Sequence, residues 1–138
     1  MIRPYQPTDK DDCIRIMGEV GWLEGKPTDS TVFDSYISDS SSFVTELHGD
    51  AEVLVLTRPG QVLVQNKDIQ MSVVMGVLAS RVARMQGHAL KTTALAIMNS
   101  AENGAAVSFW VFLTRATMTN LALEHLDITE LLQLILQN

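Results

Sequence analysis

A short basic segment between an apolar run and a helical pattern is the part of this sequence best suited to chemistry. The apolar run 71–79 leads into Arg81 and Arg84, and a helical pattern opens at Gly87. A helix N-terminus exposes unpaired N–H groups and carries a partial positive charge, so it can hold a diphosphate. Glycine has no Cβ and lets phosphates approach the backbone closely. An ordinary turn between a strand and a helix is the alternative, and these residues alone do not separate the two.

The N-terminal half must supply the elements that position this segment. A strand is expected at 2–5, followed after Thr8 by a helix that ends at Gly21, and by a second short helix at 31–38. In the first helix, apolar residues recur at helical spacing at Cys13, Ile14, Met17 and Val20. Strands are then expected at 43–47, 51–57, 62–65 and 71–79. The connecting turns are predicted at Gly49-Asp50 and, as a type II turn, at Pro59-Gly60.

A helix is predicted from Gly87 to Glu102, with Asn103-Gly104 as its C-terminal stop. Its inward face is expected to carry Leu90, Ala94, Ile97, Met98 and Ala101. A further strand is expected at 105–113. This order of elements predicts one α/β or α+β domain, a central mixed sheet flanked by helices.

Composition and charge limit the classes of function. The chain has 138 residues and a formal net charge of -6, which disfavours a nucleic-acid partner because phosphate binding needs clustered Lys and Arg. Cys13 is the only cysteine, so one chain can form neither a disulfide framework nor a Cys-based zinc site. Three separated histidines make a weak metal site, and no metal is expected. No apolar run is long enough for a membrane span, and a cytoplasmic protein without a membrane partner is expected.

The basic segment resembles a known signature. Its residues Arg84-Met85-Gln86-Gly87-His88-Ala89 are similar to the Arg/Gln-x-x-Gly-x-Gly/Ala motif of the GNAT superfamily of N-acetyltransferases. The Ile-Arg-Pro opening, the helix after it, the hairpin and the apolar strand before the motif match that family's order of elements. The longer stretch 80–87 resembles most the branch of Eis-type acetyltransferases, and the resemblance covers residues 1–108.

The resemblance implies acetyl-CoA as cosubstrate and an amine, on a small molecule or a protein, as acceptor. By position, Val77, Leu78 and Ala79 would offer backbone groups to the pantetheine arm. The diphosphate would be bound by Arg84, Met85, Gln86, Gly87, His88, Ala89 and Leu90, chiefly through main-chain N–H groups. Catalysis would consist of attack by the amine on the thioester, with a base for its proton and a donor for the departing thiolate.

The sequence departs from the family pattern after Ser108. The family continues with a strand, a helix that carries a Tyr general acid and two closing strands, whereas no Tyr follows Tyr36 here. One permitted back-translation of 109–125, read from the last base of its first codon, gives L-G-V-F-D-Q-G-Y-Y-D-Q-L-G-F-G-T, which looks like the missing segment. We therefore interpret 109–138 as an atypical, out-of-frame tail on a sheet that is incomplete at its C-terminal end. A divergent C-terminal helix is the competing interpretation.

The other candidate residues allow either a structural or a functional interpretation, and no catalytic residue is assigned. Trp22 either lines an acceptor pocket or caps the core, and Cys13 is expected to be a core residue rather than a nucleophile. His88 is expected to lie exposed in the first helical turn. The conceivable proton acceptors are Glu19, Glu24, Glu46 and Glu52.

Two other functions compete with acetyl transfer. A non-catalytic module that binds CoA or another subunit would keep the cofactor loop without turnover, and a small α/β protein would bind no cofactor. The apolar tail could also promote association, so a homo-oligomer is a candidate assembly.

Overall fold

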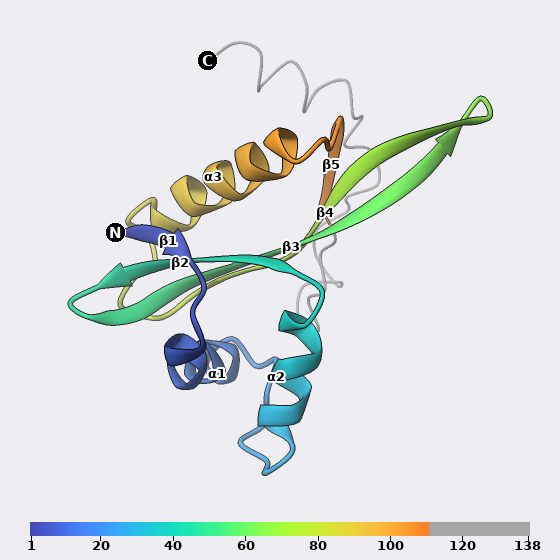
Figure 1. The fold of residues 1–138 in the computed structure, drawn as a ribbon. Coiled ribbons are helices and arrows are strands. Elements are labelled where there is room, and N and C mark those ends of the chain that lie inside the picture. Colours follow the sequence, from blue (N-terminus) through green and yellow to red (C-terminus); the bar gives the residue numbers. More distant parts are fainter. Residues whose placement is uncertain (111–138) are drawn as a thin grey trace, which may run out of the picture.

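The computed structural model describes residues 1–110, which form a mixed sheet with helices on both faces (Figure 1). The chain opens with strand β1 and a 3₁₀ turn η1, continues through helices α1 and α2, and then enters the sheet. The elements are β1 (Ile2–Pro4), η1 (Pro7–Asp9), α1 (Lys10–Glu19), α2 (Asp29–Ile37), β2 (Ser41–Leu47), β3 (Asp50–Val64), β4 (Lys67–Ala79), α3 (His88–Glu102) and β5 (Val107–Trp110). The α/β fold expected from the sequence is confirmed. The proposed tail lies outside the described residues from 111 onward.

The five strands follow one another in the order β1-β2-β3-β4-β5. The first four pair antiparallel, whereas β5 runs parallel to β4. Parallel neighbours need a crossover, and α3 supplies it. None of the described helices is long and apolar enough to cross a membrane.

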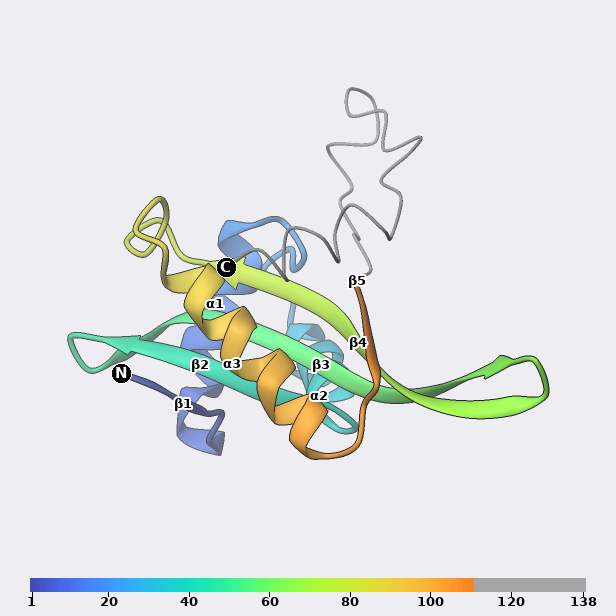
Figure 2. The same ribbon diagram turned by 90° about the horizontal axis from the view of Figure 1, so that it is seen from above.

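Helices α1 and α2 lie on one face of the sheet and α3 on the other (Figures 1 and 2). A hydrophobic core fills the space between the sheet and the helices on each face. Alternate side chains of β3 contribute to one core or the other. Leu54 and Leu56 pack with the buried face of α1 and with Phe33 of α2, whereas Val53 and Val55 point to the opposite face and pack under α3. Side chains of a strand alternate between faces, so β3 serves both cores at once.

The hairpin of β3 and β4 differs from the prediction. Instead of turning at Pro59-Gly60, β3 continues through both residues, and the chain turns at Gln65 and Asn66, whose φ angles are 48° and 61°. Two residues with positive φ form the tight turn that suits the twist of a hairpin. Pro59 is tolerated because β2 pairs with β3 only as far as Thr57, which leaves the outer edge of β3 free of a ladder there. The hairpin of β2 and β3 turns at His48 and Gly49, one residue earlier than predicted.

The predicted inward face of α3 is wrong. Leu90 and Met98 are 74% and 62% exposed, and of the predicted set only Ile97 packs against the core. The face that meets the sheet is made of small and hydroxyl-bearing residues, namely Ala89, Thr92, Thr93, Ala96 and Ser100. Small side chains let the helix approach the sheet closely, and helical periodicity alone did not distinguish this face from the larger apolar residues.

Hydroxyl pairs join α3 to the sheet within this interface. Thr45 of β2 and Thr92 lie 2.5 Å apart between their Oγ1 atoms, and Ser72 of β4 donates to Ser100 at 2.9 Å. Thr92 also donates to the His88 carbonyl at 2.8 Å, so the Thr45 hydroxyl is the donor of the shared bond. Both pairs are buried, and buried polar groups contribute stability only when their partners are in place.

Replacing Thr92 by Val should destabilise the protein more than replacing Thr45 by Val. T92V leaves the buried Thr45 donor without an acceptor, at a cost of about 1–3 kcal/mol, whereas T45V removes only one net hydrogen bond worth about 1 kcal/mol. The double variant T45V/T92V should be more stable than T92V alone. Urea unfolding of the four proteins measures this, and equal losses in the two single variants would contradict the assigned direction of the bond.

Candidate functional site

The segment between β4 and α3 forms a compact turn that is tied to the rest of the molecule at its start. Ser80 is fully buried, and its carbonyl accepts hydrogen bonds from the amides of Ala83 and Arg84, both at 3.2 Å. The amide of Arg81 donates to Glu19 Oε2 of α1 at 2.7 Å. These contacts anchor residues 80–84 and leave the second half of the turn free to present its backbone.

That second half presents a row of unpaired amides. Within the described residues, no backbone N–H from Met85 to Leu90 donates a hydrogen bond, and no side chain caps α3. Met85 and Gly87 adopt left-handed conformations with φ of 61° and 75°. Such a conformation costs a residue other than Gly about 1–2 kcal/mol, and strained turns of this kind concentrate at ligand sites. The side chain of Gln86 folds back within the turn, where its Nε2 donates to the Val82 carbonyl at 2.5 Å, and no described side chain accepts from these amides.

The charges around the turn favour an anion. The first turn of α3 contains no acidic residue to offset the positive end of the helix dipole. Arg84 lies at the turn and donates from Nε to the carbonyl of Ala79 at 3.2 Å, which holds the guanidinium beside the end of β4. Glu19 is the nearby acid, and its carboxylate is already engaged by Arg15 and by the Arg81 amide.

The last part of β4 has one free edge. The amide of Ser80 donates to the carbonyl of Glu52 on β3, so Ser80 forms a hydrogen-bonded pair with that strand. The alternation of an antiparallel ladder then directs the peptide groups of Leu78 toward β3 and those of Val77 and Ala79 away from it. Within residues 1–110, β5 pairs with residues 71–74 of β4 and no further. The backbone of Val77 and Ala79 therefore faces an edge that no described strand covers, where the Ala79 carbonyl accepts from Arg84 Nε.

A bulge marks the point where this free edge begins. Leu56 pairs with Gly76 and the next residue, Thr57, pairs with Val74, which leaves Met75 as an extra residue in β4. Val74 is also the last residue of β4 that pairs with β5 within the described chain. A bulge bends its strand and re-aims the local peptide groups, and bulges are common beside active sites.

Trp22 lies against β4 next to the bulge. A Cβ on Gly76 would come within 2.8 Å of the indole ring, so the glycine is what allows the ring to lie on the strand. The ring centroids of Trp22 and Tyr36 are 6.0 Å apart, which gives an aromatic pair beside the bulge on the face covered by α1 and α2. Trp22 is half-buried and packs against that core, so it both caps the core and borders the free edge of β4.

The acids and the thiol singled out by sequence are occupied by structural contacts. Glu46 pairs with Arg3, Glu52 and Glu19 with Arg15, and Glu24 with Lys26. Burial raises the pKa of the Cys13 thiol to about 12, which removes it as a nucleophile and confirms it as a core residue. Among the described residues, no three His, Cys, Asp or Glu side chains gather in a way that could hold a metal ion.

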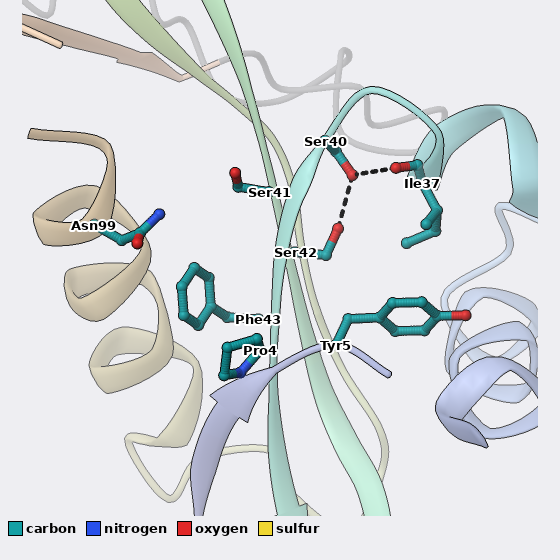
Figure 3. A pocket seen from close by; sticks show the side chains of 8 residues that line it. All are labelled: Pro4, Tyr5, Ile37, Ser40, Ser41, Ser42, Phe43 and Asn99. Carbon is teal, nitrogen blue, oxygen red and sulfur yellow. Dashed lines mark hydrogen bonds between the residues drawn. The ribbon is translucent and has the colours of Figure 1, made fainter. Parts of the chain in front are cut away.

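A pocket of about 300 Å³ lies elsewhere, at the edge of the sheet where β1 ends (Figure 3). Ser40 donates to the Ile37 carbonyl at 3.0 Å and lies 2.7 Å from the hydroxyl of Ser42, as the dashed lines show. Asn99 approaches it from the C-terminal half of α3, far along the helix from Gly87. Its lining carries no charged side chain, and it does not connect to the turn before α3.

Glu19 should couple the stability of the protein to pH through the turn. The hydrogen bond from the Arg81 amide, with that of Arg15, lowers the pKa of Glu19 below its ordinary 4.5. A depressed carboxyl pKa contributes stability above the ordinary value, and this contribution is lost as the pH falls through the folded-state pKa. E19Q should therefore be less stable than the wild type at pH 7, and the difference should shrink on acidification below pH about 4. A difference that stays constant from pH 7 to pH 3 in urea unfolding would show that this ionised pair does not hold the turn.

Comparisons with known proteins give the fold a context. No family model matches the chain, and no curated protein matches it in sequence. In structure it is similar to glucosamine-6-phosphate N-acetyltransferase from Arabidopsis thaliana, with 18% identity, a TM-score of 0.66, and 81% of each chain covered. It is also similar to an aminoglycoside N-acetyltransferase solved in complex with CoA, with 13% identity, a TM-score of 0.64, and coverage of 85% of this chain and 82% of that one.

A third similar structure is described as a transcriptional regulator from Bacillus halodurans C-125. It shares 13% identity at a TM-score of 0.68, with 99% of this chain and 89% of that chain covered. Several other neighbours are described as GNAT-family, putative or ribosomal-protein-alanine acetyltransferases. At these identities the likeness concerns the fold. The chain therefore has the fold of the GNAT acetyltransferases.

Proposed function

We propose that the chain is a member of the GNAT superfamily that binds acetyl-CoA and transfers its acetyl group to an amine. The observation that carries this proposal is the row of unpaired amides from Met85 to Leu90 at the end of the free edge of β4. The fold shared with N-acetyltransferases supports it, and so does a neighbour solved with CoA. The stretch 80–87 supports a place near the Eis-like branch.

The turn before α3 fits a diphosphate. The amides of Met85, Gln86, Gly87, His88, Ala89 and Leu90 supply donors that nothing within the described chain uses. Phosphate oxygens accept several such bonds at once, and the helix dipole adds to the attraction. Gly87 has open space where a Cβ would stand, so the backbone is free for close approach. Arg84 lies beside this cradle and contributes positive charge.

The free edge of β4 fits the amide-bearing arm of the cofactor. Val77 and Ala79 direct their peptide groups along this edge, whereas Leu78 contributes its buried side chain and keeps its peptide groups toward β3. An extended arm that leaves the turn and follows β4 reaches the bulge at Met75, about 13 Å from Ala79 at the rise of a strand. We place the acetyl group there.

The bound thioester supplies an activated acetyl group, and the protein positions an amine against it. Trp22 and Tyr36 form the wall on the α1–α2 side of the bulge, where an amine can be held next to β4. Holding two reactants in line can supply much of the rate of such a transfer. The acidic residues near the turn are held in ion pairs, so we assign none of them as the base.

Two measurements, made one after the other, test the proposal. Calorimetry with CoA first asks whether the cradle binds, and release of free CoA thiol from acetyl-CoA in the presence of an amine panel then asks whether transfer occurs. Binding followed by turnover supports the enzyme. Binding without turnover on any amine favours the non-catalytic CoA module, and no binding by folded protein contradicts the cradle itself.

Gly87 and Gly104 provide a matched pair for testing the cradle. Both have positive φ with open space at Cβ, and they lie at opposite ends of α3. G87A and G104A should each destabilise the protein by about 1–2 kcal/mol, because alanine is strained in the left-handed region.

Only G87A should weaken CoA binding, by about tenfold or more, which corresponds to roughly 1.4 kcal/mol. Calorimetry with CoA and with pantetheine, which lacks the diphosphate, completes the test. Equal losses of CoA affinity in the two variants, or an equal loss for pantetheine in G87A, would place the diphosphate elsewhere.

A further inference from the structure

Arg58 lies on the same face of the sheet as Trp22 and has no partner within the described residues. Along β3, Leu54 and Leu56 pack into the α1–α2 core, and the next residue of that alternation is Arg58. Thr57 points to the other face, where it lines a cavity with residues of α3. The extra residue of the bulge lies in β4, so it does not change the alternation of β3. The side chain of Arg58 therefore leaves the sheet on the α1–α2 side.

No group in the described chain satisfies this arginine. Arg58 Nε is buried without a hydrogen-bond partner, and no ion pair or hydrogen bond of its guanidinium occurs within residues 1–110. Arg3, the other half-buried arginine in the described chain, is held by carboxylates, and so is the exposed Arg15. An unpaired nitrogen of a cation in a buried position is costly, and such groups in native structures call for an explanation, often a ligand.

The position of Arg58 relates it to the bulge. It pairs with Val73, and Val73 pairs with Phe109 of β5, so these three lie in one row across the sheet. Met75 is two residues along β4 from that row, a distance of about 7 Å at the rise of a strand. Trp22 lies over the next position, Gly76. The row and the ring thus lie next to the bulge on neighbouring positions of β4.

We propose that Arg58 binds a carboxylate on the amine acceptor and so selects acceptors that carry both groups. This inference rests on the proposed function, because the bulge at Met75 is taken as the point of transfer. A guanidinium binds a carboxylate through two parallel hydrogen bonds, and that geometry also orients the ligand. With the carboxylate at Arg58, the amine end lies at the bulge, and an apolar spacer of about 7 Å packs on Trp22.

The negative net charge of the chain means that a carboxylate ligand needs a local cation to bind. The formal net charge of -6 repels an anionic acceptor at long range. A carboxylate would bind only where a cation is free of protein carboxylates, and Arg58 meets that condition within the described residues. The proposal therefore predicts binding that weakens with salt, because a half-exposed charge pair is screened.

The test uses two amines that differ only in the carboxylate, 4-(aminomethyl)benzoate and benzylamine. Their affinities are measured by calorimetry for the wild type, R58M, R58K and K67M, with and without saturating CoA. R58M keeps an apolar stem of similar length without the charge. R58K keeps the charge but lacks the planar guanidinium that makes two parallel hydrogen bonds. K67M removes one positive charge from the exposed end of the hairpin and is the matched control.

We expect the wild type and K67M to bind 4-(aminomethyl)benzoate at least about tenfold more tightly than benzylamine. R58M should lose this preference, R58K should retain part of it, and benzylamine should bind all four proteins alike. Circular dichroism checks that each variant is folded, and R58K provides the comparison if R58M is not. A preference that survives in R58M, or a wild type that binds the two amines equally or not at all, overturns the proposal.

The outcomes separate this inference from the function on which it rests. CoA binding and acetyl transfer that are indifferent to the carboxylate would leave the acetyltransferase standing and remove the role of Arg58. A carboxylate preference that depends on Arg58 in a protein that binds no CoA would leave the anion site standing and remove the acetyltransferase.

Discussion

The left-handed turn at Met85 and Gly87 is the constraint on which the site depends. Because the chain reverses there without a side-chain cap, the amides that open α3 have no partner in the described residues. The strain is sustained by anchors at the start of the turn. Ser80 is buried at the end of β4, and the carboxylate of Glu19 holds the Arg81 amide. Backbone strain of this kind persists only where the surrounding structure determines it.

The packing interface between α3 and the sheet keeps the turn in place. Small residues and hydroxyl pairs bring the helix close to β2 and β4, and Thr92 links the first turn of α3 to Thr45. A helix held this rigidly keeps its N-terminus at the end of β4. The same strand is bent by the bulge at Met75, so one strand connects the proposed cradle with the proposed point of transfer.

Sequence patterns predicted the elements around the candidate site better than the turns and packing faces. The apolar strand, the basic turn and Gly87 are consecutive, and the boundaries of α3 follow from its stop signal and its glycine start. The predicted position of the β3–β4 turn and the predicted inward face of α3 are both wrong. Pro59-Gly60 is a strong local turn signal, but the pairing of β3 with β4 overrides it because Pro59 needs no ladder hydrogen bond on a free edge. Leu90 and Met98 are the more hydrophobic residues of α3, but they stay exposed, and the helix packs on the sheet through its small residues.

The sequence by itself determined the order of elements, the mixed α/β class and the candidate cradle, because each rests on residues that are neighbours in the chain. Only the tertiary structure decided which amides are unpaired, which edge of β4 is open and where Trp22 lies. It also placed Arg58 beside the bulge, without a partner in the part of the chain that the structure describes. Those properties depend on register, and register arises from contacts between strands far apart in the sequence, which local propensity and periodicity do not encode.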